Sequence, residues 1–258
     1  MTFQTITYDL SDDVATIRLN RPDKMNALNA VMRIELGEAF VQAAEDARVV
    51  ILTGNGPGFC AGQDLGDVKS LNDLDLERTL REEYEPLLQR IYECPIPVIA
   101  AINGSAAGAG ANIALSADII IAARSASFLE AFARIGLIPD AGGTYWLPRK
   151  IGMARAMGMS LLAEPIPAEK AAEWGLIWEV VDDETLESRA SEIAQRMAQG
   201  PTAAYRMIKQ ALKASPANDM AEQLALEAKL QGKAGRSQDF IEGVTAFLEK
   251  RKPVYQGR

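Results

Sequence analysis

The chain of 258 residues contains no histidine. This absence excludes catalysis by Ser-His-Asp or Cys-His groups and disfavours a zinc site. Cysteine is scarce too, because Cys60 and Cys94 lie far apart and form no CxxC pair. The acidic start of the chain does not resemble a signal peptide. We therefore expect a cytoplasmic protein.

Basic residues are outnumbered, with 27 Lys and Arg against 35 Asp and Glu and a net charge of -8. No basic stripe is present, which argues against a nucleic-acid-binding surface. Residues 96–117 carry no charge and could span a bilayer by length. However, Pro97 and the sequence NGSAAGAG interrupt them, so we expect a buried strand, a turn and a buried helix there.

Short apolar runs alternate with helical patterns along most of the chain. Alternating β-branched runs at 5–8 and 14–19 flank Ser-Asp-Asp and predict a hairpin. Asn29 is expected to cap a helix with an apolar stripe and with Glu35 on its polar face. The runs VVILTG, PVIAAI and DIIIAA predict buried strands followed by turns and helices, and so an α/β core.

The character of the sequence changes near its C-terminus. We expect a core over residues 1–195 and a helical oligomerisation region over 196–258. The last helical pattern repeats Phe240, Val244 and Phe247 on one face, and this apolar stripe needs to be covered.

Two glycine-rich segments are candidates for binding an anion. NGSAAGAGAN lacks the third glycine of a dinucleotide-binding fingerprint, because Ile113 stands there, and it is not a P-loop. Its small residues could simply allow a helix to pack closely on the sheet. Alternatively, free N–H groups at the helix start and in the loop GFCAGQDL could converge on one oxygen as an oxyanion hole.

Asp140, in the segment GLIPDAGGTYWL, allows two interpretations. Aspartate is a favoured helix N-cap, and the preceding proline suits a turn. A carboxylate held against apolar walls can instead carry protons. This segment alone leaves both readings open.

Five segments in order along the chain carry a resemblance: NRPDKMNALN, ILTGNGPGFCAGQDL, AAINGSAAGAGANIALSADIIIAA, GLIPDAGGTYWLPR and GVTAFLEKRKPVY. Together they resemble the crotonase (enoyl-CoA hydratase/isomerase) superfamily. The resemblance implies an α/β crotonase-like spiral of repeated ββα units with a helical C-terminal trimerisation region. It also implies an acyl-CoA substrate, a homo-trimer or hexamer, and no cofactor beyond the CoA of the substrate. Because histidine is absent, we expect no metal site.

The resemblance also assigns roles to single residues. The backbone N–H groups of Gln63 and Ala109 would form the oxyanion hole. Substrate contacts would come from Arg21, Lys24, Ala27, Ala61, Asp64, Gly110 and, from a neighbouring subunit, Lys250. Arg21 and Lys24 could equally be plain surface charges, and Asp64 is expected mainly to fix its loop. The shape of the acyl pocket would depend on residues 66–90 and 129–146.

The departures from the family pattern bear on the reaction. Asn112 and Phe132 stand where a typical hydratase has two glutamates that position water, and Glu130 is expected at the surface. Asp140 is then the expected proton carrier. The segment around it resembles the subgroup that isomerises ring-1,2-epoxyphenylacetyl-CoA to an oxepin and shifts double bonds in enoyl-CoAs, in which this aspartate is the acid/base.

Three alternatives remain at this point. Cys60 could be a nucleophile, although no base accompanies it and an inert buried thiol is expected. A hydratase is possible if Asp140 or another acid activates water. A non-catalytic, RNA-binding member of the superfamily would need a basic face, which the net charge opposes.

Overall fold

The computed structural model describes residues 2–67 and 75–257. Within them the chain forms two sheets. The larger sheet has six strands in the order β1 (Ile6–Ser11), β2 (Val14–Leu19), β3 (Val49–Gly54), β5 (Val98–Ile102), β7 (Ile119–Ala123) and β10 (Glu179–Val181). The smaller sheet has four, in the order β4 (Gly58–Cys60), β6 (Ser105–Ala107), β8 (Ser127–Leu129) and β9 (Ile166–Pro167).

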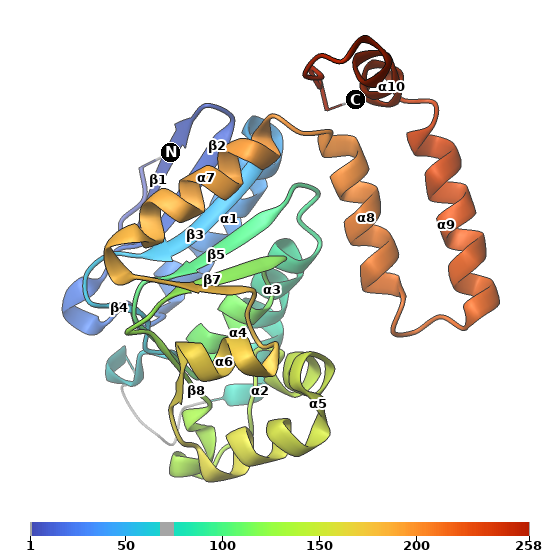
Figure 1. The fold of residues 1–258 in the computed structure, drawn as a ribbon. Coiled ribbons are helices and arrows are strands. Elements are labelled where there is room, and N and C mark those ends of the chain that lie inside the picture. Colours follow the sequence, from blue (N-terminus) through green and yellow to red (C-terminus); the bar gives the residue numbers. More distant parts are fainter. Residues whose placement is uncertain (1, 68–74, 258) are drawn as a thin grey trace.

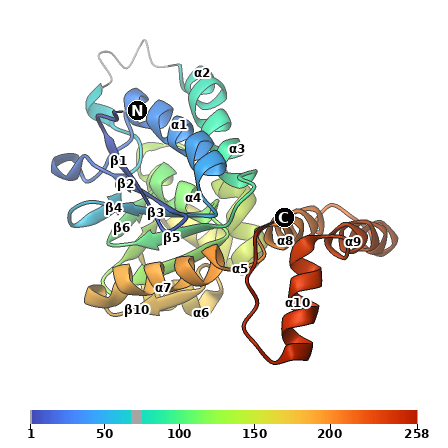
Figure 2. The same cartoon turned by 90° about the horizontal axis from the view of Figure 1, so that it is seen from above.

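The larger sheet is parallel from β2 onward, and only β1 pairs antiparallel, with β2. Helices cover both of its faces (Figures 1 and 2). One face carries α1 (Ala30–Asp46), α3 (Glu85–Tyr92) and α4 (Ala109–Leu115), and the other carries α7 (Leu186–Ala198). The mixed α/β architecture expected from the alternating pattern is confirmed.

Local sequence signals account for several of these elements. The hairpin turn uses Asp12 and Asp13, both in the left-handed region with φ of 51° and 62°. The Asn29 side chain accepts a hydrogen bond from the Met32 N–H and so caps α1, as predicted. The expectation that Glu35 lies on the polar face of this helix is wrong, because its carboxylate is buried. The cost of burial is offset by hydrogen bonds that the carboxylate accepts from the backbone N–H groups of Gln4 and Thr5 and from the Thr5 hydroxyl.

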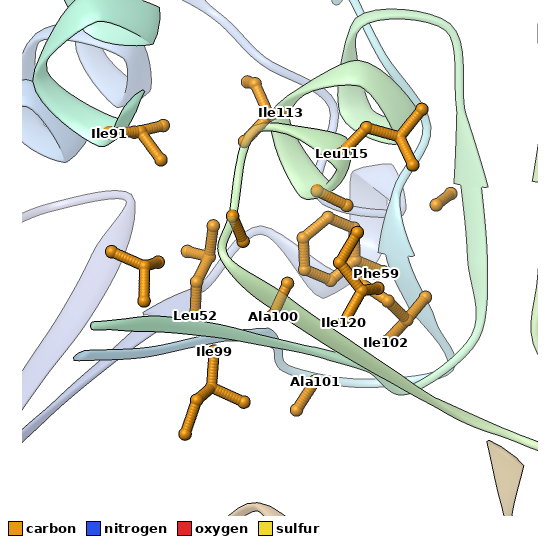
Figure 3. Close-up of a cluster of buried hydrophobic side chains, with 14 of the residues drawn as sticks. Leu52, Phe59, Ile91, Ile99, Ala100, Ala101, Ile102, Ile113, Leu115 and Ile120 are labelled. Carbon is orange, nitrogen blue, oxygen red and sulfur yellow. The ribbon is translucent and has the colours of Figure 1, made fainter. Parts of the chain in front are cut away.

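The core lies between the larger sheet and the helices beside it. Figure 3 shows Leu52 of β3 and Ala100 of β5 on the face of the sheet toward Phe59 of β4 and Ile113 of α4, whereas Ile99 of β5 points to the opposite face. All five side chains are almost fully buried. This packing fixes β4 and α4 relative to the sheet, and the two glycine-rich loops adjoin these two elements.

Apart from four short 3-10 turns, the remaining helices of the described residues are α2 (Leu76–Thr79), the π-helical turn η4 (Leu80–Tyr84), α5 (Gly143–Leu162), α6 (Ala168–Trp174), α8 (Thr202–Ala214), α9 (Met220–Ala234) and α10 (Gln238–Glu249). Figure 1 shows α8, α9 and α10 extending away from the sheet. The apolar side chains of Phe240, Val244 and Phe247 are exposed on α10. No helix in the described part of the chain has both the length and the apolar character needed to cross a bilayer.

Candidate active site

Two backbone segments meet where β4 and β6 end. A Cβ atom added to Gly62 would lie 2.8 Å from the carbonyl oxygen of Ala107 and 3.6 Å from the nitrogen of Ala109. One added to Gly110 would lie 2.6 Å from the Cβ and Sγ atoms of Cys60. Glycine at both positions therefore allows the loop after β4 to contact the start of α4.

This contact brings two N–H groups together. The nitrogen of Ala109 opens α4, where no helical carbonyl is available to it. Leu28 pairs with the Gln63 segment by donating to the Gly62 carbonyl and accepting from the Asp64 N–H. Neither Gln63 nor Ala109 donates its backbone N–H to any of the described residues. The arrangement thus leaves two adjacent donors for an anionic oxygen.

Hydrogen bonds to the Gln63 side chain fix one side of the loop that contains it. Its Oε1 accepts hydrogen bonds from the Tyr84 hydroxyl at 2.5 Å and from the Arg33 guanidinium at 3.0 Å. Arg33 is itself fixed, since it donates to the Leu28 carbonyl and pairs with Glu83. Tyr84 ends the π-helical turn, a type of irregularity that is frequent at functional sites. These contacts restrain the direction of the Gln63 N–H.

An ion pair holds the same loop from the other side. Asp64 accepts from the Gly66 N–H at 2.9 Å and pairs with Arg21 at 2.8 Å, and this pairing lowers the pKa of the Asp64 carboxyl. Arg21 also donates to the carbonyl of Ala27. Arg21 is therefore engaged within the loop rather than free at the surface, and its contact with CoA stays a prediction. The guanidinium links the segment after β2 to the oxyanion loop.

Asp140 does not cap α5. The helix begins at Gly143 with Gly142 as its N-cap, and no side chain makes a capping hydrogen bond there. Ala141 and Gly142 both have positive φ and turn the chain away from Asp140 before the helix starts. The carboxyl is half-buried, and its Oδ1 has no hydrogen-bond partner among the described residues.

The surroundings of Asp140 suit a proton carrier. Burial raises the pKa of its carboxyl from 3.8 to about 6, close to the range in which a general base works best. Burial also raises the pKa of the Tyr84 phenol, and the negative charge of Asp140 adds to that rise. The backbone carbonyl of Asp140 accepts a hydrogen bond at 2.8 Å from the side chain of Asn112, which lies in the helix that Ala109 opens, so Asp140 and the oxyanion donors belong to one site.

The expectation that Glu130 lies at the surface is wrong. Glu130 follows β8 and is 0% exposed. The β6–α4 turn adjoins it, because the Gly108 N–H donates to the carbonyl of Leu129 at 2.7 Å. Burial raises the pKa of the Glu130 carboxyl to about 8, although the hydrogen bond from Asn112 opposes the rise. A second carboxyl group therefore lies in this region.

Asn112 and Phe132 lie close to the same turn. Both are buried, and a Cβ added to Gly108 would lie 3.6 Å from the Phe132 ring. Neither side chain can act as a base. The two positions that the resemblance aligns with the glutamates of a hydratase therefore lie beside this turn and hold an amide and a phenyl ring.

The other predicted substrate-binding residues differ in their exposure to solvent. Lys24 and Ala61 are exposed, and Ala27 and Gly110 are buried beside the oxyanion loop. Lys250 directly follows α10, in the part of the chain that extends from the sheet, and is not brought to this site within one chain. Residues 68–74 of the expected pocket wall lie outside the described residues.

Cys60 is packed beneath the site. It is buried, its thiol donates to the Asn26 carbonyl, and burial raises its pKa to about 12. A thiol in this state is a poor nucleophile. The interpretation of Cys60 as an inert packing residue is supported.

Almost the whole chain matches one known protein family. The sequence profile described as "Enoyl-CoA hydratase/isomerase" covers residues 9–258. The chain belongs to this family.

Two relatives within the family carry different names. A protein of Rhodobacter capsulatus named "Probable enoyl-CoA hydratase" is 58% identical over 258 residues, which cover 100% of both chains. The "1,2-epoxyphenylacetyl-CoA isomerase" of Escherichia coli is 49% identical over 251 residues, 95% of each chain. The crystal structure of an enoyl-CoA hydratase from Bacillus anthracis superimposes with a TM-score of 0.92 at 37% identity, covering 99% of this chain and 100% of that one. The protein is thus an enzyme of the enoyl-CoA hydratase/isomerase family, with the crotonase fold.

Proposed function

We propose that this enzyme is an acyl-CoA isomerase that moves a proton through a thioester enolate. The observation that carries the proposal is Asp140, a half-buried carboxyl with a raised pKa near two free backbone donors. The amide of Asn112 and the ring of Phe132 support it further, since neither can activate water in place of a glutamate. Candidate reactions are 3-enoyl-CoA to 2-enoyl-CoA and ring-1,2-epoxyphenylacetyl-CoA to its oxepin form.

In the double-bond shift, the Asp140 carboxylate removes a proton from the carbon next to the thioester carbonyl. The electron pair of that C–H bond forms an enolate, whose oxygen accepts hydrogen bonds from the N–H groups of Gln63 and Ala109. Protonated Asp140 then returns the proton two carbons further along the chain. The double bond moves from position 3 to position 2, and no water, metal or redox cofactor takes part.

For the CoA moiety we propose the loop that contains Lys24 and Ala27. Lys24 is exposed and forms no ion pair within the described part of the chain, so its ammonium group can meet a phosphate. Arg21 is already paired with Asp64, so we assign it to loop positioning. Lys250 would act on the CoA of a neighbouring subunit.

Hydration of 2-enoyl-CoA is a second candidate. Glu130 gives the site a second carboxyl group, and the relative from Rhodobacter capsulatus is named as a hydratase. A pair of carboxyls could hold and activate a water molecule. The two reactions consume different substrates and therefore can be separated.

The purified enzyme can be given 3-enoyl-CoA, 2-enoyl-CoA and ring-1,2-epoxyphenylacetyl-CoA in parallel, with products identified by mass spectrometry. We expect turnover of the first or the third without any gain in mass. Conversion of 2-enoyl-CoA to a product heavier by one water, at a rate above that of either isomerisation, would establish the hydratase instead.

We further propose that the protein assembles in threes through its C-terminal helices. Exposed apolar side chains on α8, α9 and α10 would otherwise contact water, among them Leu212, Leu224, Phe240 and Phe247. Light scattering should give three or six times the chain mass of 27.9 kDa. A single-chain mass at micromolar concentration would contradict this.

A further inference from the structure

Glu130 is buried without a cation to balance it. The carboxyl is 0% exposed and forms no ion pair with any described residue. Its Oε2 accepts one hydrogen bond, from the amide of Asn112 at 3.3 Å, and its Oε1 has no partner in the described part of the chain. A buried carboxylate in such surroundings costs far more free energy than a protonated carboxyl does.

One amide links Glu130 to the segment that carries Asp140. The Nδ2 group of Asn112 donates to Glu130 and also, at 2.8 Å, to the backbone carbonyl of Asp140. Asn112 has little freedom of its own, since it is 0% exposed and a Cβ on Gly143 would lie 2.6 Å from its Nδ2. The end of β8, the first turns of α4 and the residues before α5 therefore meet at one side chain.

We propose that Glu130 is a positioning residue of this active site, which works in its uncharged form by holding Asn112 and, through it, the Asp140 segment. This inference rests on the proposed function, because the group that it positions is the proton carrier. A second consequence is electrostatic. A negative charge on Glu130 would oppose both the ionised Asp140 and the enolate that forms in the reaction.

The titratable groups near Glu130 also favour its uncharged form. The pKa of Glu130 is raised to about 8, by burial first and by the charge of Asp140 to a smaller extent. Helix α4 has no titratable side chain. On the turn that follows Glu130, the Arg134 guanidinium is engaged elsewhere, since it donates to the carbonyl of Ala163. At neutral pH Glu130 is therefore protonated and Asp140 is ionised.

The pH dependence of kcat/KM for isomerisation tests this role. Activity should rise through about pH 6 as Asp140 loses its proton and fall above about pH 8 as Glu130 loses its own. On the alkaline side the fall should approach about tenfold per pH unit. Glu130→Gln keeps an uncharged group of the same shape, so it should retain the acid limb and lose the alkaline limb, whatever its plateau rate. Glu164→Gln, at an exposed glutamate, is the matched control and should show both limbs.

Infrared spectroscopy of the folded protein tests the protonation state without any substrate. The wild type should show a protonated-carboxyl band at neutral pH that fades above about pH 8. The band should be absent from Glu130→Gln, or from Glu130→Leu if only that variant folds. If no substrate is isomerised, the proposed function fails while this band still decides the state of Glu130. An alkaline limb that persists in Glu130→Gln, or a missing band, would overturn the inference.

Discussion

Replacing Asp140 by asparagine is expected to lower turnover by a factor of about 100 to 10,000, the range typical of losing a general acid–base group. Asparagine keeps the shape of the side chain but cannot accept a proton at neutral pH. Exchange of solvent deuterium into the carbon next to the thioester carbonyl should disappear together with the activity. A substrate-like thioester should still bind, because the donors of Gln63 and Ala109 are backbone groups that the substitution leaves in place.

Asp140→Asn should not lower the stability of the folded protein. The sign of this stability change follows from the pKa of Asp140. The pKa of Asp140 is about 6 in the folded protein, against 3.8 for an ordinary aspartate in water. Its contribution to stability is thus fully present below pH 3.8 and is lost as the pH rises through about 6. At neutral pH the ionised carboxyl destabilises the fold, so the asparagine variant should melt at the same or a higher temperature.

Asp46→Asn provides the matched control, because Asp46 is exposed at the end of α1 and touches no part of the site. It should retain wild-type turnover. If folded Asp140→Asn isomerises its substrate as fast as this control does, Asp140 is not the proton carrier. No capping role would then be left for it either, since its side chain caps no helix.

The parts of the site that could be predicted from sequence depend on local signals. Glycine permits the close approach of two backbone segments, so GFCAGQDL and NGSAAGAGAN indicate the two donor loops from sequence alone. Asn29 as a helix cap and the apolar strands were predictable for the same reason, because each depends on a few consecutive residues.

The burial of Glu130 could have been predicted from the alternation of side chains along the strand that precedes it, which the expected surface position does not take into account. Along a strand, alternate side chains point to the same face. Phe128 is buried in β8, and Glu130, two residues later, continues on its face. The expected surface position takes Glu130, two residues before Phe132, to point away from the site if the segment is extended, but residues two apart in an extended segment share a face.

The restraints on Gln63 could not have been predicted at all. Arg33 comes from α1 and Tyr84 from η4, separated from Gln63 by 30 and 21 residues. Their polar groups converge only because α1 and η4 pack together beside the loop. No short pattern encodes such a contact, and Arg33, although charged, is 5% exposed.

Replacing Ala109 by proline is expected to lower kcat by about 100- to 1,000-fold, the effect of removing one oxyanion-hole donor. Ala109 is the first residue of α4, a position that tolerates proline because its N–H has no helical acceptor. Gly108 before it has φ of 52° and ψ of -128°, outside the helical region that a following proline disfavours. The substitution therefore removes one N–H group while the helix can still form.

Gln238→Pro is the matched control, since Gln238 is the exposed first residue of α10 and lies remote from the site of its own chain. Both variants should keep the far-ultraviolet circular dichroism of the wild type, and only Ala109→Pro should lose turnover. Calorimetry with a non-reacting acyl-CoA separates lost transition-state stabilisation from a pocket blocked by the proline ring. In the first case thioester binding weakens little compared with the loss in kcat, because an enolate accepts a stronger hydrogen bond than a neutral carbonyl does. Turnover of Ala109→Pro equal to that of Gln238→Pro would show that the N–H of Ala109 does not stabilise the enolate.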